Sequence, residues 1–149
     1  MVGKTKNRTQ ADDARLSILA EYCLPCILSH WDGHGTIQHK TTAGRREEDQ
    51  HQRTYPACRW HHLGEVPDHI IDRQHAQELL GPSFAHTKSL YEATYGDEED
   101  LILVADAVVR ITLSARRRSE YISRRKMSSL VRQIHREITS KKMEAHIAH

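Results

Sequence analysis

The sequence predicts an α+β fold, in which a small zinc-stapled core carries added helices and a basic C-terminal helical arm. Three observations lead to this prediction. Hydrophobic residues make up 38% of the 149-residue chain and aromatic residues only 5%, so the apolar core is thin. Small cores commonly need a metal or another cross-link. Cysteine and histidine pairs at metal-ligand spacing lie in the first half of the chain, and arginine and lysine gather in the last third.

The first half of the chain predicts one helix followed by loops and short strands. Residues 1–10 are poor in apolar side chains, which is typical of a flexible tail. Apolar residues on one helical face predict a helix from Ala11 to about Tyr22. No helical period follows between Cys23 and Pro67, where glycine and proline recur. Within that stretch, residues 36–39 suit a short strand.

The second half predicts helices. One is expected over 69–80, and Pro82 suits the first position of another that ends at Gly96. Asp97 suits the cap of the next helix, because three acidic residues fill the first turn after it. Apolar residues from Met127 to Ile138 form a further helical stripe. We therefore assign residues 11–109 to one compact domain and residues 110–149 to the helical arm.

Two short motifs supply the ligands for a zinc ion. Cys23 and Cys26 form a C-x-x-C pair, and Cys58 and His61 form a C-x-x-H pair 32 residues after Cys26. Three thiolates and one imidazole make a complete tetrahedral set for structural Zn²⁺. The alternatives are buried cysteines that act as small hydrophobic residues, or a redox-active C-x-x-C pair. The two motifs together use all three cysteines of the chain, which favours zinc.

Positive charge is concentrated in the arm. Residues 110–142 carry eleven Lys and Arg against two Glu, a net +9, while residues 1–109 carry a net −6. A basic arm on an acidic body indicates a polyanion partner, most simply nucleic acid. The alternative is a solvated basic helix with no partner. The candidate phosphate-binding residues are Arg45, Arg46, Arg116, Arg117, Arg118, Arg124, Arg125 and Lys126.

Histidine is the other unusual feature, since nine of the twelve histidines fall between His30 and His86. His62 directly follows the zinc ligand His61, and adjacent side chains point in different directions. His61 can therefore face the zinc while His62 faces a second site. This arrangement resembles that of a ββα-metal (HNH) nuclease built on a zinc staple.

The spacing of these residues resembles the recombination-enhancement (Ref) nucleases of phages, RecA-dependent relatives of the HNH endonucleases. The family's knuckle reads T-x-P-x-C-x-x-H-H, and this chain has that pattern from Thr54 to His62, with His69 seven residues later. The family closes with an F-E-x-x-Y-G helix, where this chain has Tyr91 to Gly96 in the same pattern. The resemblance covers about residues 15–103. It does not extend to the arm.

The resemblance implies a catalytic site in addition to the zinc. His39 is the expected general base on the first strand, and His62 is an expected ligand of a catalytic Mg²⁺ or Mn²⁺ ion, with His51 and His69 nearby. His51 either holds this ion or orients His39 or the phosphate. One departure matters, because the family commonly has His-His where this chain has Gln38-His39. That change implies one protein ligand fewer, or an inactive derivative.

The expected function is a metal-dependent DNA endonuclease, with a RecA-type recombinase filament as a partner. The alternatives are an inactive zinc-stapled nucleic-acid-binding module and a protein-interaction adaptor whose C-terminal stripe packs on a partner, including a second copy as a homodimer. No apolar segment follows Met1, and no window reaches the 18 or so apolar residues of a membrane span. We therefore expect a cytoplasmic protein, in the bacterial host cell if it is phage-encoded.

Overall fold

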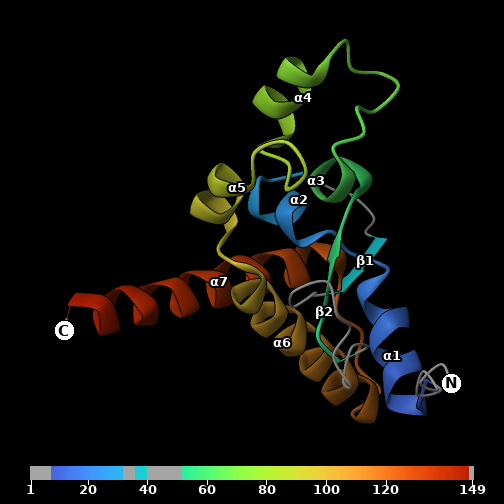
Figure 1. Cartoon of the computed structure of the whole chain (residues 1–149). Coiled ribbons are helices and arrows are strands. Elements are labelled where there is room, and N and C mark those ends of the chain that lie inside the picture. The colour runs from blue at the N-terminus through green and yellow to red at the C-terminus, as the bar shows by residue number, and fades with distance from the viewer. Residues whose placement is uncertain (1–7, 32–35, 40–51, 148–149) are drawn as a thin grey trace, which may run out of the picture.

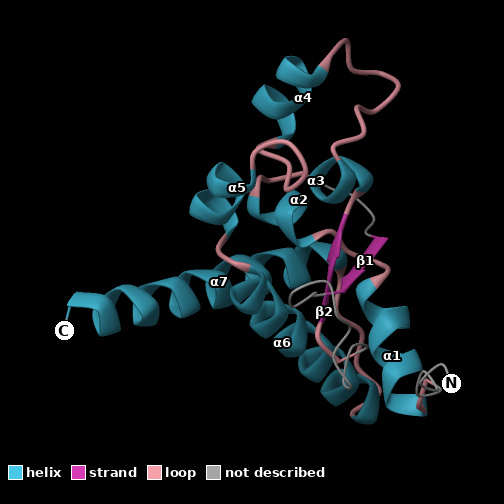
Figure 2. Ribbon diagram, viewed as in Figure 1, coloured by secondary structure: helices cyan, strands magenta, loops and turns pink. Residues whose placement is uncertain are grey.

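A computed structural model describes residues 8–31, 36–39 and 52–147 (Figure 1). Within these ranges the chain is mostly helical and contains a two-stranded sheet, in agreement with the predicted α+β class (Figure 2). The elements follow in the order α1 (Gln10–Leu19), α2 (Leu24–Leu28), β1 (Thr36–His39), β2 (Thr54–Ala57), α3 (Arg59–Leu63), α4 (Arg73–Leu80), α5 (Lys88–Tyr95), α6 (Glu98–Arg117) and α7 (Arg124–Ile147).

The sheet is an antiparallel pair of strands, β1 and β2. Thr36 lies opposite Ala57, and His39 lies opposite Thr54. The first strand, β1, has the bounds that the sequence predicted, residues 36–39. Only Cys58 separates β2 from α3, so two strands and a helix follow one another in the order β1, β2, α3.

The start of β2 is held by a buried arginine that the sequence analysis did not single out. Arg15 of α1 is only 3% exposed. Its Nε donates to Thr54 Oγ1 at 2.9 Å, and its Nη2 donates to the Thr54 carbonyl at 2.6 Å. Its Nη1 forms an ion pair with Asp106 of α6 at 2.6 Å. Because a buried guanidinium is costly unless its donors are satisfied, this network fixes α1, β2 and α6 to one another.

The apolar core is built around α6. The side chains of Leu101, Val104 and Val108 are fully buried and pack against residues of α1, β2 and α7. The predicted cap at Asp97 is confirmed, since its side chain accepts from the Asp100 N–H and Asp100 returns the bond in a capping box. The helix is continuous through residues 109–110, so the predicted domain boundary lies inside α6.

The prediction that a helix begins at Pro82 is wrong, because residues 82–87 form a turn and α5 begins at Lys88. Tertiary contacts hold the turn. The Phe84 N–H donates to the His61 carbonyl at 2.8 Å. The buried Ser83 accepts from the His86 N–H at 3.2 Å. A polar side chain that bonds to nearby backbone competes with helix formation, which accounts for the difference.

The apolar stripe of α7 is used within the chain itself. Met127 and Val131 are fully buried, and Ile134 and Ile138 pack against the same core. The helix crosses α6, and its C-terminal end projects away from the rest of the chain (Figure 1). A homodimer through α7 stays a prediction. In the described ranges, no helix is long and apolar enough to span a membrane.

Candidate metal centre

The first knuckle forms the start of α2. Cys23 is the N-cap of this helix, and its sulfur accepts hydrogen bonds from the Cys26 N–H and the Cys58 N–H, both at 3.2 Å. Pro25 lies in the first turn, where a missing N–H costs nothing. The C-x-x-C spacing therefore places both sulfurs at the N-terminus of one helix, where backbone donors and the helix dipole favour thiolates.

The second knuckle repeats this arrangement at the start of α3. Cys58 is the N-cap, and its sulfur accepts from the His61 N–H at 3.5 Å. The helix is five residues long and ends at Gly64, so its direction is set by the cap and by tertiary contacts rather than by its own length. The two knuckles meet although 32 residues separate Cys26 from Cys58.

The four predicted zinc ligands converge on one point. The Nδ1 atom of His61 lies 3.1 Å from the Cys58 sulfur, 3.5 Å from the Cys26 sulfur and 3.7 Å from the Cys23 sulfur. All four ligand atoms lie within 4.8 Å of one another. In a tetrahedral zinc site, bond lengths of about 2.3 Å to sulfur and 2.0 Å to nitrogen separate these atoms by roughly 3.6 Å. Cys23, Cys26, Cys58 and His61 can thus hold a metal such as zinc.

The orientation of His61 comes from its second ring nitrogen. Nε2 lies 2.8 Å from the Leu80 carbonyl, which can only accept, so Nε2 carries the proton and Nδ1 presents its lone pair to the sulfurs. The Tyr95 hydroxyl lies 3.3 Å from the same Nε2. Gly81 allows this packing, since a Cβ there would approach the Tyr95 hydroxyl to 2.1 Å. The sequence analysis did not identify these supporting residues.

The thiols differ in acidity. Burial raises the pKa of Cys23 well above its usual value. Hydrogen bonds from Cys23 and Cys26 lower the pKa of the less buried Cys58 thiol. A bound cation would favour the thiolate form of all three. Cys23 and His61 are fully buried, which suits a closed structural site rather than a catalytic one with an open position.

His62, the residue after the ligand His61, is not part of this cluster. It is half-buried on α3, and its burial lowers its pKa, which favours the neutral imidazole that binds metal ions. Within the described part of the chain, its side chain has no hydrogen bond or ion pair. Cys23, Cys26, Cys58 and His61 form the one group of three or more potential metal ligands among the described residues, and His62 is not a member.

The structure leaves the other predicted catalytic residues apart or undescribed. His69 is exposed in the loop before α4, where it lines a cavity of about 540 Å³ with Trp31 and Trp60. Among the described residues that line this cavity, His62 is absent. For His39 the structure gives the backbone position in β1, opposite Thr54. His51, Arg45 and Arg46 lie outside the described residues.

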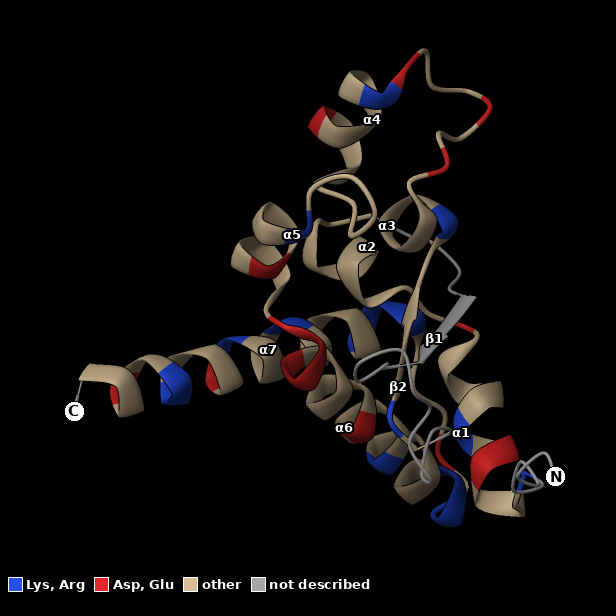
Figure 3. Ribbon diagram, in the orientation of Figure 1, with Lys and Arg blue, Asp and Glu red and all other residues tan. Residues whose placement is uncertain are grey.

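Lys and Arg recur along the end of α6 and along α7 (Figure 3), and the six predicted cations of the arm fall into two groups by their contacts. Two are bound within the chain. Arg118 donates to Ser114 and Glu120, and Arg124 donates to the Glu21 carbonyl with its guanidinium 5.4 Å from the centre of the Tyr22 ring. The side chains of the other four are exposed and make no hydrogen bond or ion pair with any described residue: Arg116, Arg117, Arg125 and Lys126.

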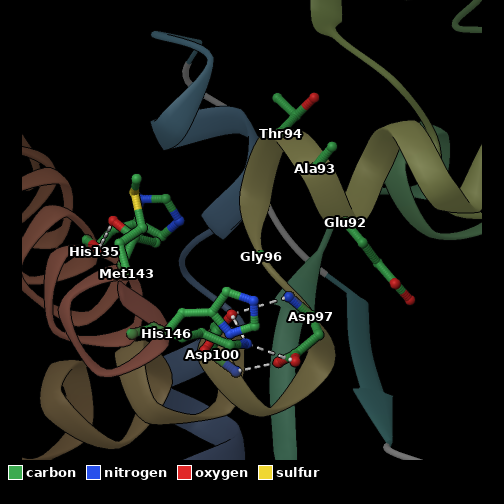
Figure 4. Close-up of a pocket in the computed structure, with 11 residues that line it drawn as sticks. Glu92, Ala93, Thr94, Gly96, Asp97, Asp100, His135, Met143 and His146 are labelled. Atoms are coloured by element: carbon green, nitrogen blue, oxygen red, sulfur yellow. Dashed lines mark hydrogen bonds and ion pairs between the residues drawn. The ribbon is translucent and has the colours of Figure 1, made fainter. Parts of the chain in front are cut away.

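A further cation, Lys142, connects the C-terminal half of α7 to the start of α6. Lys142 Nζ donates to Asp97 Oδ2 at 2.9 Å and to the largely buried Asp100 Oδ2 at 3.1 Å. These groups line a cavity of about 510 Å³ between the start of α6 and α7, together with His135 and His146 (Figure 4). The hydrogen bonds that Lys142 donates to the Asp97 and Asp100 carboxylates raise the pKa of Lys142. Burial raises the pKa of Asp97, but the hydrogen bonds from Lys142 and Asp100 outweigh it and lower the net value.

Lys142→Met should lower the free energy of unfolding by about 1 kcal/mol, since the pair is partly exposed and screened by solvent. Lys141→Met is the matched control. Lys141 is the exposed residue directly before Lys142, and its replacement should change the free energy of unfolding by less than about 0.5 kcal/mol. The contribution of Lys142 should vanish as the pH rises through its raised pKa, and that of Asp97 as the pH falls through its lowered pKa. Denaturant unfolding of both variants at several pH values measures this, and equal losses at Lys141 and Lys142 would refute the assignment.

Comparison with known proteins supports the resemblance read from the motifs. No solved structure matches the chain. Residues 8–110 match the family described as Recombination enhancement, RecA-dependent nuclease. The match includes both knuckles, the sheet and the first half of α6, and it ends before α7. The chain belongs to this family of RecA-dependent recombination-enhancement nucleases.

Proposed function

We propose that this protein is a metal-dependent DNA endonuclease of HNH type that acts together with a RecA-type recombinase filament. The observation that supports it best is the placement of two adjacent histidines on α3. His61 is committed to the buried cluster of sulfurs, and His62 is half-buried beside it with no partner among the described residues. The cluster thereby fixes the short helix that presents His62. The order β1, β2, α3 is the order that a ββα-metal site requires.

The chemistry assigned to the site is in-line hydrolysis of a phosphodiester. His39 takes the proton from the attacking water, a task suited to an imidazole because its ordinary pKa lies near 6.5. A divalent Mg²⁺ or Mn²⁺ ion would act as a Lewis acid toward the charge that grows on the phosphate oxygens. His62 would hold it, with His51 and His69 as the further ligand candidates. The neutral imidazole that burial favours at His62 fits this role.

Arg15 is a positioning residue in this proposal. It binds both the hydroxyl and the carbonyl of Thr54, and His39 pairs with Thr54 across the sheet. The backbone of His39 is thus set relative to β2, which leads directly into α3. The proposed base lies on β1 and the proposed metal ligand on α3, the helix that follows the paired strand β2.

The test is nicking of supercoiled plasmid by the full chain with Mg²⁺ or Mn²⁺, with and without a recombinase filament. We expect divalent-metal-dependent cleavage that the filament stimulates. Cleavage of equal rate without a divalent metal would contradict the metal-dependent mechanism. Cleavage that the filament leaves unchanged would contradict the recombinase dependence alone.

A second candidate function is an inactive member that binds nucleic acid or a protein partner. One observation favours it, namely Gln38 at the position where the family commonly has histidine. An amide is a poor ligand for these cations, so the catalytic ion would have one protein ligand fewer. Tight DNA binding with no cleavage at any metal concentration would decide for this alternative.

Gln38→His tests the effect of that departure. If the position faces the metal, the variant should bind Mn²⁺ about tenfold more tightly, which corresponds to about 1.4 kcal/mol. Calorimetric titration of the zinc-loaded protein with Mn²⁺ measures this without requiring cleavage. Gln74→His on the exposed side of α4 is the control, because it adds a histidine away from the site. Equal Mn²⁺ affinity in wild type and Gln38→His would place residue 38 outside the metal site.

A further inference from the structure

The corner where α6 ends and α7 begins has an unusual distribution of charge. Residues 116–126 contain six Arg and Lys and one acidic residue, Glu120. Arg118 pairs with that carboxylate at 3.2 Å, and Arg124 is bound to the body through the Glu21 carbonyl and the Tyr22 ring. The remaining four cations are exposed, and in the part of the chain that the structure describes their side chains make no hydrogen bond or ion pair. We call this surface, Arg116–Lys126, the basic corner.

The N-terminus of α7 adds to this positive charge. The positive end of a helix dipole favours acidic side chains in the first turn, as α6 shows with Glu98, Glu99 and Asp100. The first turn of α7 has no acidic residue and instead carries Arg124, Arg125 and Lys126. Cations at this end of a helix repel the dipole and one another. An external anion would relieve that repulsion, which is the situation in which helix N-termini bind phosphate.

A cavity lies within the basic corner. It has a volume of about 310 Å³ and extends from the corner to α1. Its lining includes two arginines, two carboxylates and two aromatic rings: Arg116, Arg124, Glu21, Glu120, Tyr22 and Tyr121. Tyr22 is largely buried and already covered by the Arg124 guanidinium. Tyr121, in contrast, is 86% exposed, although an aromatic ring gains free energy from burial. Tyr121 and Arg116 line the same cavity, and an exposed aromatic ring combined with nearby positive charge is typical of surfaces on which nucleobases stack.

The turn between the helices holds these groups in place. The Glu120 N–H donates to the Ala115 carbonyl at 2.8 Å, and the Ser119 N–H donates to the Arg116 carbonyl at 3.0 Å. Ser119 adopts a left-handed conformation with φ 55°, which a non-glycine residue adopts at a cost. Ser123 then caps α7 by accepting from the Lys126 N–H at 3.1 Å. Tyr121 therefore extends from a turn that is bonded on both sides.

We propose that the basic corner binds a single DNA strand, with one unpaired base stacked on Tyr121 and the flanking phosphates on Arg116, Arg117, Arg125 and Lys126. The proposal rests on the proposed function insofar as that function makes DNA the partner. An unpaired base is chosen over duplex DNA because a duplex leaves no base face free for Tyr121. The site is separate from the candidate metal centre, and all of it, residues 116–126, lies beyond the family match at residues 8–110.

The experiment measures binding of a fluorescent oligo-dT strand by anisotropy, using the full zinc-loaded chain without Mg²⁺ or Mn²⁺. Tyr121→Ala should weaken binding about 5- to 150-fold, the range that base stacking on one aromatic ring supplies, and leave the salt dependence unchanged. Tyr121→Trp should retain the affinity. Arg116→Ala/Arg117→Ala should instead flatten the plot of log K against log salt by about 1.4, or 0.7 for each phosphate contact on a single strand.

Arg136→Ala/Lys141→Ala is the matched control. It also removes two exposed cations from the arm, but Lys141 lies sixteen residues along α7 from Arg125, a distance of roughly 24 Å. The salt slope of this variant should equal that of wild type. Duplex DNA of the same length should bind Tyr121→Ala and wild type equally. Since Tyr121 is exposed, none of these differences should reflect loss of the fold, and thermal unfolding of each variant checks this.

Unchanged oligo-dT affinity in Tyr121→Ala, or equal salt slopes in the arginine pair and its control, would overturn the proposal. The proposal would also be overturned if variants of the basic corner bound DNA normally but lost a salt-insensitive complex with a recombinase. The corner would then serve a protein partner. Repeating the titrations in His39→Ala separates this inference from the proposed function. A chain that never cleaves can still show the Tyr121 effect, and a chain that cleaves can lack it.

Discussion

Cys58→Ala should yield a chain that neither retains zinc nor folds. The cluster joins two knuckles that no continuous element connects, and one partner of Cys58, His61, is fully buried. Zinc sites of this type contribute roughly 10–16 kcal/mol of apparent binding free energy, which exceeds or equals the total stability of about 5–15 kcal/mol of an ordinary domain. Zinc content by mass spectrometry and unfolding followed by circular dichroism measure the two effects together.

The control for Cys58→Ala is His62→Ala. His62 lies on the same five-residue helix but outside the cluster, so this variant should keep one equivalent of zinc and a cooperative unfolding transition. Removal of zinc from the wild type with a chelator should reproduce the unfolded state, and addition of zinc should reverse it. One full equivalent of zinc in a well-folded Cys58→Ala protein would refute the ligand set.

The second large effect is expected at the proposed base. His39→Ala should lower the rate of plasmid nicking by about 10²–10⁴, the usual contribution of general acid–base catalysis. Zinc content, thermal stability and DNA affinity should remain close to those of the wild type, because His39 lies outside the zinc cluster and outside the basic corner. The comparison is made at saturating Mn²⁺, so that a change in metal affinity cannot imitate a change in rate.

His146→Ala is the matched control for His39→Ala. His146 is exposed near the end of α7, away from the sheet, and its replacement should leave the nicking rate unchanged. Equal nicking by His39→Ala and wild type would eliminate His39 as the base. Equal losses in both variants would indicate a general effect of histidine removal on the protein and not the loss of a catalytic group.

Local patterns in the sequence were sufficient for the features that depend on near neighbours. The spacing of Cys23 and Cys26, and of Cys58 and His61, places each pair on one turn of helix, and both knuckles have the expected ligands. The cap at Asp97 and the strand at Thr36–His39 were also predicted. In the knuckles and the cap the atoms that interact are separated by three residues, so the chain itself brings them together. The strand, in contrast, was predicted from its composition, and its partner β2 lies 15 or more residues away.

Contacts between distant segments were decided by the tertiary structure alone. The Leu80 carbonyl selects which nitrogen of His61 faces the sulfurs, and the His61 carbonyl holds the turn that replaces the helix predicted at Pro82. Arg15 is another example, because its partners Thr54 and Asp106 lie 39 and 91 residues away.

In the basic arm, some properties follow from the local sequence and others from the tertiary structure. Its composition alone predicts a helix with a polyanion partner, since charge and periodicity are local properties. Only the fold shows that Arg124 and Lys142 are bound within the chain. The side chains of the other predicted cations make no hydrogen bond or ion pair with any described residue: Arg116, Arg117, Arg125 and Lys126. Which cations are free for a partner depends on the carbonyls and carboxylates that packing brings within reach, and those come from segments far away in the sequence.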